Sequence, residues 1–517
     1  MDRRLRLAGA AGVGGVVGSY AVAGYSRQFV VAPIDAFVVR STPGSLVAFM
    51  ITNVGGEAHL LHVALSVALA VGALGAAGLA GYAAARRLGR APRLVAPALG
   101  GALAWGVAAA LTTRPVLSLG AAVPVALLVA VETVSLPTEG ATVPSANRRV
   151  LLSEVGSVVL VAIAGGVGLL RARSGESTSG SGSESADDAV ATATPDEMQS
   201  AEAETATAEE ELTEVERLLA DAESRSLDLA AADLPGLVSE IGNFYNVDIA
   251  QFDPEVPSDT WSMTFTGAVG EERTITYAEL TDRSVEHRYV TLRCVGEKLN
   301  GKKLDTAVWT GTPLKPLLEE VDPGGACGCA MLRAEDGYFV QFPVEALEDA
   351  FLAWEMNGQP LPTSHGHPVR VLVPGHWGET NVKWLSEIEL LEQEAKGYWE
   401  KRGWHGTGPV NTVAKLWATT RLDGGEIEVA GHAYAGTRGI ERVEVSTDGG
   451  ESWTDAELSE PLPGEDVWRQ WRHVYEPEAS HEVVVRAVDG TGTVQPKEES
   501  DAYPSGSTGW VSKRIDV

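Results

Sequence analysis

The sequence predicts an α-helical membrane bundle, then a mixed α+β domain, then an all-β sandwich, and three observations lead to this prediction. Long apolar stretches nearly free of charge fall within the first 173 of the 517 residues. From Leu237 onward, short apolar runs alternate with turn residues, and helical pattern is limited to short pieces. After Thr412 the pattern becomes strand, turn, strand over about 105 residues, which is typical of a β-sandwich.

Five apolar stretches in the first part are long enough to cross a bilayer as helices. A removed signal peptide would account for the first alone, so we predict a multi-pass region over residues 1–173 that contacts membrane lipid. A shorter piece from Leu46 to Val54 is expected to lie at the interface or to re-enter. The predicted spans run from about Leu7 to Tyr25, Leu60 to Tyr82, Leu94 to Thr112, Val116 to Val134 and Leu151 to Leu170.

Arginines determine the predicted orientation of these spans. With five spans, nine arginines fall on the side of the amino terminus and five on the other. This bias places the amino terminus inside the cell, and an odd number of spans then places everything after Arg173 outside it. We therefore predict a protein of the cell membrane whose later domains are extracytoplasmic. Arg3 and Arg4 before an apolar run are compatible with twin-arginine export, although ordinary charge bias produces the same pair.

Residues 174–235 are predicted to be an acidic, low-complexity linker, because 17 acidic residues against 2 basic ones cannot bury a core. A short amphipathic helix is expected within it, where apolar residues recur at helical spacing. The net charge of −30 argues against nucleic acid as a partner and suits a halophilic protein that stays hydrated in concentrated salt. The helically spaced residues are Leu212, Val215, Leu218, Leu219 and Ala222.

Three cysteines are too few for a disulfide-built scaffold. Cys327 and Cys329 have no nearby histidine to complete a zinc site, so we expect them to be small packing residues near the start of a strand. Cys294 follows the β-patterned run from Tyr289, where a lone cysteine is usually buried packing. Its thiolate is also a soft donor suited to a metal that cycles between high oxidation states.

Several segments occur together in the order and rough spacing of one known family. These segments are Asn243-Phe244-Tyr245, the Cys294 run, Trp309 to Leu314, His365 to Arg370, Asn381-Val382-Lys383-Trp384, Gly431 to Tyr434, Glu441 to Trp453 and Arg486 to Gly490. With them, the chain from Leu237 to Val517 resembles the sulfite oxidase family of molybdopterin-dependent oxidoreductases.

The resemblance implies a sulfite-oxidase-type molybdopterin domain over residues 236–410 and an immunoglobulin-like dimerisation domain over residues 411–517. It implies a molybdenum–molybdopterin cofactor with Cys294 as the metal ligand, a homodimer formed through the last domain, and a separate electron carrier. Arg370 and Lys383 suit a phosphate chemically, because each offers a fixed cation. The residues implied to line or hold the cofactor are Asn243, Phe244, Tyr245, Cys294, His365, Arg370, Asn381, Val382 and Lys383.

The sequence departs from the family where substrate would bind. Asn246 stands in place of a basic residue, Glu297 and Lys298 replace arginines after the cysteine, and the family's catalytic tyrosine falls near Trp404. We expect Cys294, Tyr245 and Trp404 at the reacting centre, and Arg293, Lys298, Lys302 or Arg402 as compensating cations. The substrate is then a small oxo compound, either a sulfite-like anion or a neutral sulfoxide or N-oxide. The alternative is an inactive membrane receptor or scaffold that retains the fold.

Haem is not expected in the membrane region. Its only histidines, His59 and His62, lie at i and i+3 on one predicted helix and cannot clamp opposite faces of a haem. We expect their ring nitrogens to face water at the interface.

Overall fold

The computed structural model describes residues 3–50, 58–87, 92–134, 212–231, 233–249 and 252–516. The chain divides into two compact units, each described here by itself. The first contains the described residues up to Thr42, those of 58–134, and Phe252 and Asp253. The second contains residues 43–50, 212–249 and 254–516 in their described parts.

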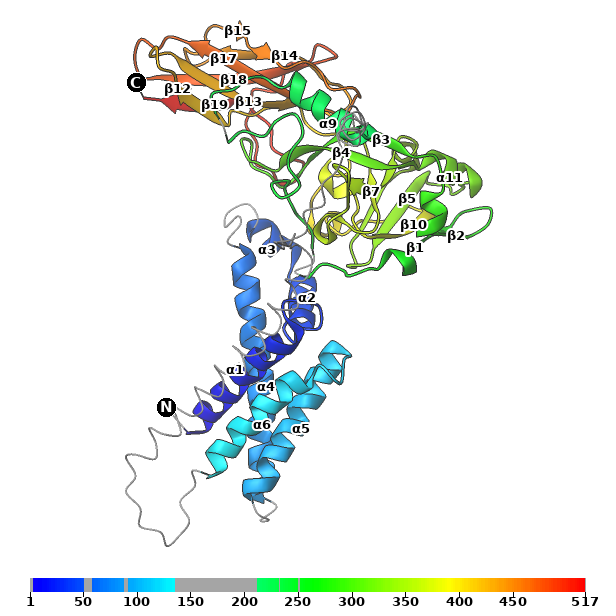
Figure 1. The fold of residues 1–517 in the computed structure, drawn as a ribbon, viewed down its shortest axis with the longest axis vertical. Helices are drawn as coiled ribbons and strands as arrows, with labels where there is room; N and C mark the ends of the chain where they lie inside the picture. Colours follow the sequence, from blue (N-terminus) through cyan, green and yellow to red (C-terminus); the bar gives the residue numbers. More distant parts are fainter. Residues whose placement is uncertain are drawn as a thin grey trace, which may run out of the picture. The chain divides into compact units, whose positions relative to one another are not determined.

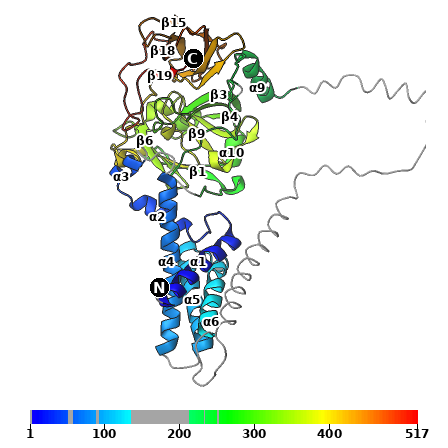
Figure 2. The same cartoon turned by 90° about the vertical axis from the view of Figure 1, so that its left-hand side faces the viewer.

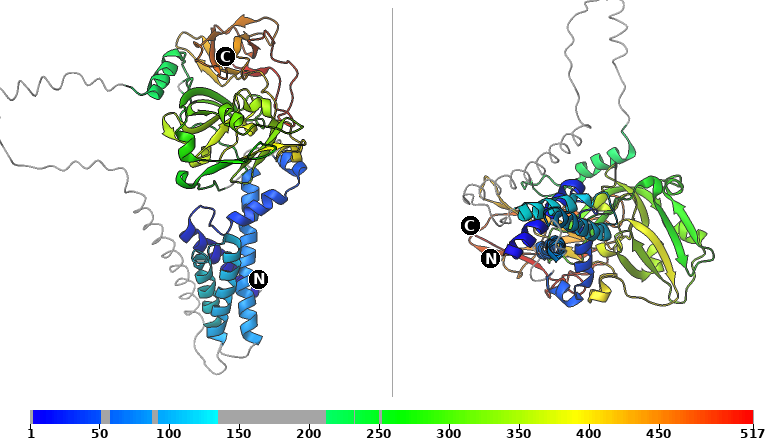
Figure 3. Two further views of the ribbon diagram at one scale, coloured as in Figure 1. Left: turned by 90° about the vertical axis from the view of Figure 1, so that its right-hand side faces the viewer. Right: turned by 90° about the horizontal axis from the view of Figure 1, so that it is seen from below.

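The first unit is a bundle of apolar helices (Figure 1). Figure 2 shows α4 running alongside α5 and α6, and Figure 3 shows the same bundle from two further sides. Small residues allow close approach, since a Cβ added at Gly12 of α1 would lie 2.0 Å from the carbonyl oxygen of Val71 in α4. The helices are α1 (Arg3–Ala23), α2 (Ala32–Ser41), α4 (Ala58–Arg87), α5 (Pro92–Thr112) and α6 (Leu119–Val134).

Three helices in the described part are long and apolar enough to cross a membrane, over Arg4–Ala23, Leu60–Arg87 and Val95–Thr112. They agree with the first three predicted spans. The fourth is shorter than predicted, because the apolar helix covers Leu119–Thr133 only. Residues 115–118 form a turn before this helix begins. The fifth predicted span lies outside the described residues.

Two smaller membrane predictions also have outcomes. In the predicted interfacial piece, α3 (Gly44–Phe49) is helical, and residues 51–54 lie outside the described part.

The expectation that His62 presents its ring nitrogens to water is wrong for Nδ1, which lies 2.9 Å from Oδ1 of Asp35. Ser66 donates to the same oxygen at 2.8 Å. Asp35 is buried, and a buried carboxylate requires such partners.

The second unit begins with the predicted mixed α+β part, which holds two five-stranded sheets. One has the order β2-β1-β10-β5-β6, and the other has the order β3-β4-β7-β8 with β9 paired to β7. Its short helices are α10 (Tyr277–Thr281) and α11 (Lys315–Glu320). The strands are β1 (Ser262–Gly267), β2 (Arg273–Thr276), β3 (Glu286–Arg293), β4 (Leu304–Pro313), β5 (Cys329–Ala334), β6 (Phe339–Pro343), β7 (Phe351–Met356), β8 (Gln359–Pro360), β9 (Arg370–Leu372) and β10 (Leu385–Leu391).

The predicted all-β sandwich is confirmed as two antiparallel sheets around one apolar core that includes Val429, Val443 and Trp471. The turn at residues 448–450 joins β14 to β15, with Gly449 and Gly450 at positive φ. The strands are β11 (Val413–Ala414), β12 (Ala418–Arg421), β13 (Ile427–Tyr434), β14 (Ile440–Ser446), β15 (Thr454–Asp455), β16 (Glu457–Leu458), β17 (Arg469–Tyr475), β18 (His481–Asp489) and β19 (Val511–Ile515).

The amphipathic helix expected near residue 212 forms as α9 (Glu214–Arg225). A capping box between Thr213 and Glu216 starts it, because each side chain accepts from the other residue's backbone N–H. Val215 and Ala222 are buried as the spacing predicts. Leu212 precedes the helix and is exposed, so it does not belong to the apolar stripe.

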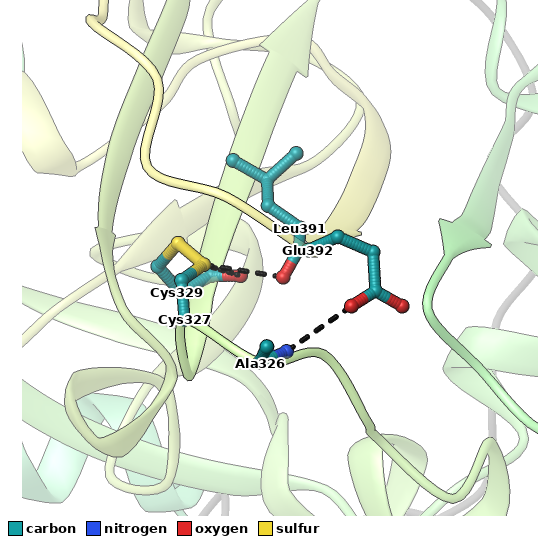
Figure 4. Close-up of a disulfide and its surroundings, with 5 residues drawn as sticks. All are labelled: Ala326, Cys327, Cys329, Leu391 and Glu392. Atoms are coloured by element: carbon teal, nitrogen blue, oxygen red, sulfur yellow. Dashed lines mark hydrogen bonds between the residues drawn. A yellow bond between two sulfur atoms is a disulfide. The ribbon is translucent and has the colours of Figure 1, made fainter.

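Cys327 and Cys329 differ from the sequence prediction. They are not separate packing residues, because their sulfur atoms form a disulfide across Gly328 (Figure 4). Gly328 has φ +56°, and the turn brings the two Cα atoms to 5.3 Å, a separation that a disulfide spans. Next to it, the Ala326 N–H donates to Oε2 of Glu392 at 3.2 Å. The pairing depends on this turn, which spacing alone does not reveal.

Candidate functional site

Cys294 directly follows β3, whose residues pair with β4 along the whole strand. Its N–H donates to the carbonyl oxygen of Lys303 at 3.0 Å, which closes the turn between the two strands. The side chain is half-buried and is the one free cysteine among the residues that the structure describes. Burial raises the pKa of the thiol, and the charges of Glu297 and Glu379 add to this, while Lys303 opposes it.

Glu297 fixes this turn through a buried ionic network. Its Oε1 accepts from Arg293 Nε at 2.9 Å and from Lys415 Nζ at 2.5 Å, and its Oε2 accepts from the Lys303 N–H at 3.0 Å. All three charged side chains are no more than 1% exposed. Lys415 precedes β12, so the network joins the cysteine turn to the sandwich. Arg293 is therefore held by Glu297 and is not a free substitute for the family's arginines.

Aromatic rings pack beside the cysteine turn. Phe244 is buried and meets His365 and Trp309 edge to face, with ring centroids 5.5 and 5.8 Å away. The neighbouring Tyr245 donates its N–H to Oδ2 of Asp305 at 2.9 Å. Burial together with the charge of Cys294 raises the pKa of the Tyr245 phenol, so it remains a neutral hydroxyl. The structure thus brings Phe244, Tyr245 and His365 together with the Cys294 turn.

Arg370 and His365 lie next to these aromatic residues. Arg370 is buried at the start of β9, donates to the carbonyl oxygens of His365 at 3.1 Å and Asn381 at 3.0 Å, and lies over the Trp309 ring. Burial lowers its pKa to about 10. Burial and the nearby Arg370 charge lower the pKa of His365 to about 4, so its ring is neutral at pH 7. A cation and a neutral imidazole therefore lie side by side.

The segment from Asn381 to Lys383 approaches the His365 loop closely. A Cβ added at Gly366, where φ is +111°, would lie 3.1 Å from Cα of Lys383. Lys383 Nζ donates to the side chains of Asn246 and, at 3.1 Å, Asp248. Asn381 uses its side-chain amide for the backbone, accepting from the Val373 N–H at 2.8 Å.

Two predicted cofactor residues differ from the rest in placement. Val382 is buried in the apolar core of the α+β part, so only its backbone can face a ligand. Asn243 is exposed and donates to Oε2 of Glu240 at 3.1 Å. The sequence could not distinguish these positions, because both lie inside motifs whose other members point inward.

Trp404 is buried after η7 (Glu400–Arg402) and meets Tyr503 edge to face with ring centroids 5.2 Å apart. Tyr503 belongs to a loop that follows the sandwich strand β18. In the same loop, a Cβ added at Gly506 would lie 2.2 Å from the Trp377 ring, so glycine is required there. The loop of the second domain therefore packs against Trp404 and Trp377. The family motifs did not indicate this contact.

Several of these residues carry buried polar atoms without a hydrogen-bond partner. Six of the ten such atoms in the described part of the chain belong to Arg293, His365, Arg370, Glu379 and Trp404. Leaving a buried polar group unbonded costs about 1–3 kcal/mol, so these atoms are expected to meet a polar ligand. Arg293 Nη2, Arg370 Nε and Trp404 Nε1 are donors. A donor-rich site fits an anionic, acceptor-rich cofactor such as molybdopterin.

Two family models match this part of the chain. Residues 250–399 match the oxidoreductase molybdopterin binding domain, and residues 410–503 match the Mo-co oxidoreductase dimerisation domain. The matches lie next to each other and together include most of the residues placed above. Trp404, Gly506 and the residues before 250 lie outside both matches.

Curated relatives agree with these matches. The chain is 28% identical over 304 residues to the mitochondrial sulfite oxidase of Rattus norvegicus, covering 47% of this chain and 54% of that protein. It is 25% identical over 303 residues to the sulfite oxidase of Arabidopsis thaliana, covering 46% of this chain and 77% of that protein. It is 32% identical over 183 residues to the mitochondrial sulfite oxidase of Drosophila melanogaster, covering 29% and 32%. The chain spans about half the length of most of the sulfite oxidases it matches.

Proposed function

We propose that this chain, whose residues 250–399 and 410–503 carry the two domains of sulfite oxidase-family molybdopterin oxidoreductases, is a membrane-anchored molybdenum-cofactor enzyme. It acts on a small oxo substrate and exchanges electrons with a separate carrier. The observation that carries this proposal is the set of unpartnered buried donors on Arg293, Arg370 and Trp404, together with Cys294, the free thiol of the described residues.

The cofactor would be held by residues from several segments. Cys294 would supply the thiolate ligand to the metal, with Phe244 and Tyr245 beside it. Arg370 and His365, each with an unpartnered nitrogen, would bind the pterin, and Lys383 would face its phosphate. When bound, the molybdenum cofactor supplies two-electron oxygen-atom transfer. Tyr245 and Trp404 would line the reacting centre, where Trp404 can donate from its indole N–H.

The charges near Cys294 favour a neutral substrate over a dianion. Arg293 and Lys415 both bind Glu297, so their charge is partly compensated, and Lys298 is exposed. The charge of Lys303 also acts on Cys294, but the charges of Glu297 and Glu379 oppose it. A sulfoxide or an N-oxide requires no cluster of cations, whereas a sulfite-like anion does. We therefore rank the neutral oxo compounds above sulfite.

The remaining parts support an anchored protein. The three long apolar helices would span the membrane, and the matched dimerisation domain supports a homodimer. The positive-inside bias supports an extracytoplasmic position for the catalytic domain. The acidity of the chain supports function in concentrated salt.

Metal analysis of the full chain, purified in detergent from cofactor-replete cells, tests the proposal. We expect about one molybdenum per chain, as one ligating thiolate implies. Cys294→Ser should abolish turnover and leave the circular dichroism spectrum unchanged. Reductive assays with a sulfoxide and an N-oxide, run beside oxidative assays with sulfite on one preparation, identify the direction. Protein without molybdenum would refute the proposal, and loaded protein that turns over none of these substrates would favour the receptor or scaffold.

A further inference from the structure

The disulfide of Cys327 and Cys329 lies at one end of the sheet that contains β5, β6 and β10. Cys329 is the first residue of β5 and pairs with Leu391 of β10 on one side and with Pro343 of β6 on the other. Cys327 lies two residues earlier, in the turn that leads into this strand (Figure 4). The disulfide therefore joins a residue fixed inside the sheet to a residue of the turn before it.

This disulfide contributes little to the stability of the fold. A cross-link stabilises a protein mainly by restricting its unfolded chain, and the restriction grows with the length of the closed loop. Here a single residue, Gly328, separates the two cysteines. Other bonds also hold the turn. The Gly328 carbonyl oxygen accepts from the Val344 N–H at 2.9 Å, and the Ala326 N–H donates to Oε2 of Glu392 at 3.2 Å. Opening the disulfide should therefore leave the turn in place.

The reduced form would gain a hydrogen bond that the disulfide cannot make. Sγ of Cys327 lies 3.1 Å from the carbonyl oxygen of Leu391 (Figure 4). A disulfide sulfur carries no hydrogen and cannot donate to this oxygen, whereas a Cys327 thiol can donate through its S–H. This acceptor favours the dithiol over the disulfide. The surroundings thus accommodate both redox forms, which a reversible exchange site requires.

Access to the two sulfur atoms is unequal. Cys329 is 3% exposed, whereas Cys327 is half-buried and Gly328 between them is exposed. A Cβ added at Gly328 would meet no heavy atom of the described residues within 4 Å apart from its two chain neighbours, so space over the turn is open. Thiol–disulfide exchange begins when a thiolate attacks an accessible disulfide sulfur. Cys327 is therefore the expected point of attack.

We propose that the Cys327–Cys329 pair is a thiol–disulfide exchange site whose partner is a protein dithiol. The partner's thiolate attacks Sγ of Cys327, the sulfur–sulfur bond breaks, and Cys329 leaves as a thiolate that takes up a proton. The partner's second thiolate attacks the partner's own sulfur in the mixed disulfide and releases Cys327, which takes up a proton and donates to Leu391. Two electrons and two protons pass to the pair, and the partner becomes a disulfide. This exchange is independent of the proposed molybdenum site.

Equilibration of the full-chain protein in detergent with mixtures of reduced and oxidised glutathione tests the inference without molybdenum or turnover. Differential alkylation and peptide mass spectrometry measure the reduced fraction of the pair separately from Cys294. We expect the pair to pass reversibly between disulfide and dithiol with an unchanged circular dichroism spectrum, whereas a structural disulfide resists glutathione. A pair that stays oxidised in excess reduced glutathione until urea unfolds the chain would overturn the inference. Thiols that fail to pair in excess oxidised glutathione would also overturn it.

Single variants test which sulfur is attacked. Cys329→Ser leaves the Cys327 thiol and Cys327→Ser leaves the Cys329 thiol, so each variant is the matched control of the other. Peptide mass spectrometry follows their mixed disulfides with dithiodipyridine. Cys327 should react about 10-fold faster or more than Cys329, because thiol reactivity depends on exposure. Equal rates or the reverse order in folded variants would overturn Cys327 as the point of attack.

Discussion

Replacing Glu297 by alanine should strongly destabilise the second unit. The substitution removes the one carboxylate that binds both Arg293 Nε at 2.9 Å and Lys415 Nζ at 2.5 Å, in side chains that are no more than 1% exposed. Two buried cations would then lack a counter-ion. Removing one partner of a buried ion pair costs about 3–5 kcal/mol, which for a domain of this size lowers Tm by roughly 10 °C.

Urea unfolding followed by circular dichroism measures this loss. The matched control is Glu348→Ala, which breaks the exposed pair with Lys315 at 3.2 Å and should cost less than about 1 kcal/mol. Adding Lys415→Met to Glu297→Ala should restore part of the stability, because one stranded charge is removed. A loss no larger than that of the control, or a double variant with no recovery, would refute the account of this network.

Three further predictions concern other parts of the second unit. Gly406→Ala should displace the Glu379 carboxyl group and cost about 1–3 kcal/mol in urea unfolding, as overpacking does; an unchanged midpoint would contradict this. Replacing Cys327 and Cys329 by serine should cost only about 1–2 kcal/mol, because so short a closed loop restricts the unfolded chain little; a larger loss would show that the disulfide has another role. Acidification from pH 6.5 to 4 should destabilise the wild type more than His365→Gln, since the unfolded imidazole gains its proton in this range and the native one, with a pKa of about 4, does not; parallel pH profiles would exclude this.

The organisation of the chain could be predicted because hydrophobic pattern reports local burial. Long uncharged stretches predicted the helices at Leu60–Arg87 and Val95–Thr112, and alternation predicted the sandwich strands. The helix near Val215 was predicted from spacing in the same way. The fourth span was overestimated because hydropathy alone does not distinguish the turn at residues 115–118 from the helix that follows it.

The Cys294 turn and its aromatic wall were predicted from motifs, and the structure brings most of those residues together. Three features required the tertiary structure. The Cys327–Cys329 disulfide depends on a turn at Gly328, the placement of Asn243 away from the others depends on its exposure, and the role of Glu297 depends on Lys415, 118 residues away. Each arises from contacts between segments distant in sequence or from backbone geometry, which local pattern does not contain.

By itself, the sequence determined the order of the parts, the position of Cys294 and the family motifs around it, because these depend on composition, periodicity and residue identity. Only the tertiary structure decided how each charge is used. Glu297 is compensated by two buried cations, whereas burial of the Glu379 carboxyl group and the charge of Glu400 together raise the pKa of Glu379 to about 7. Both are ordinary acidic residues in the sequence. Their opposite electrostatic surroundings follow from which distant side chains the fold packs against each carboxyl group.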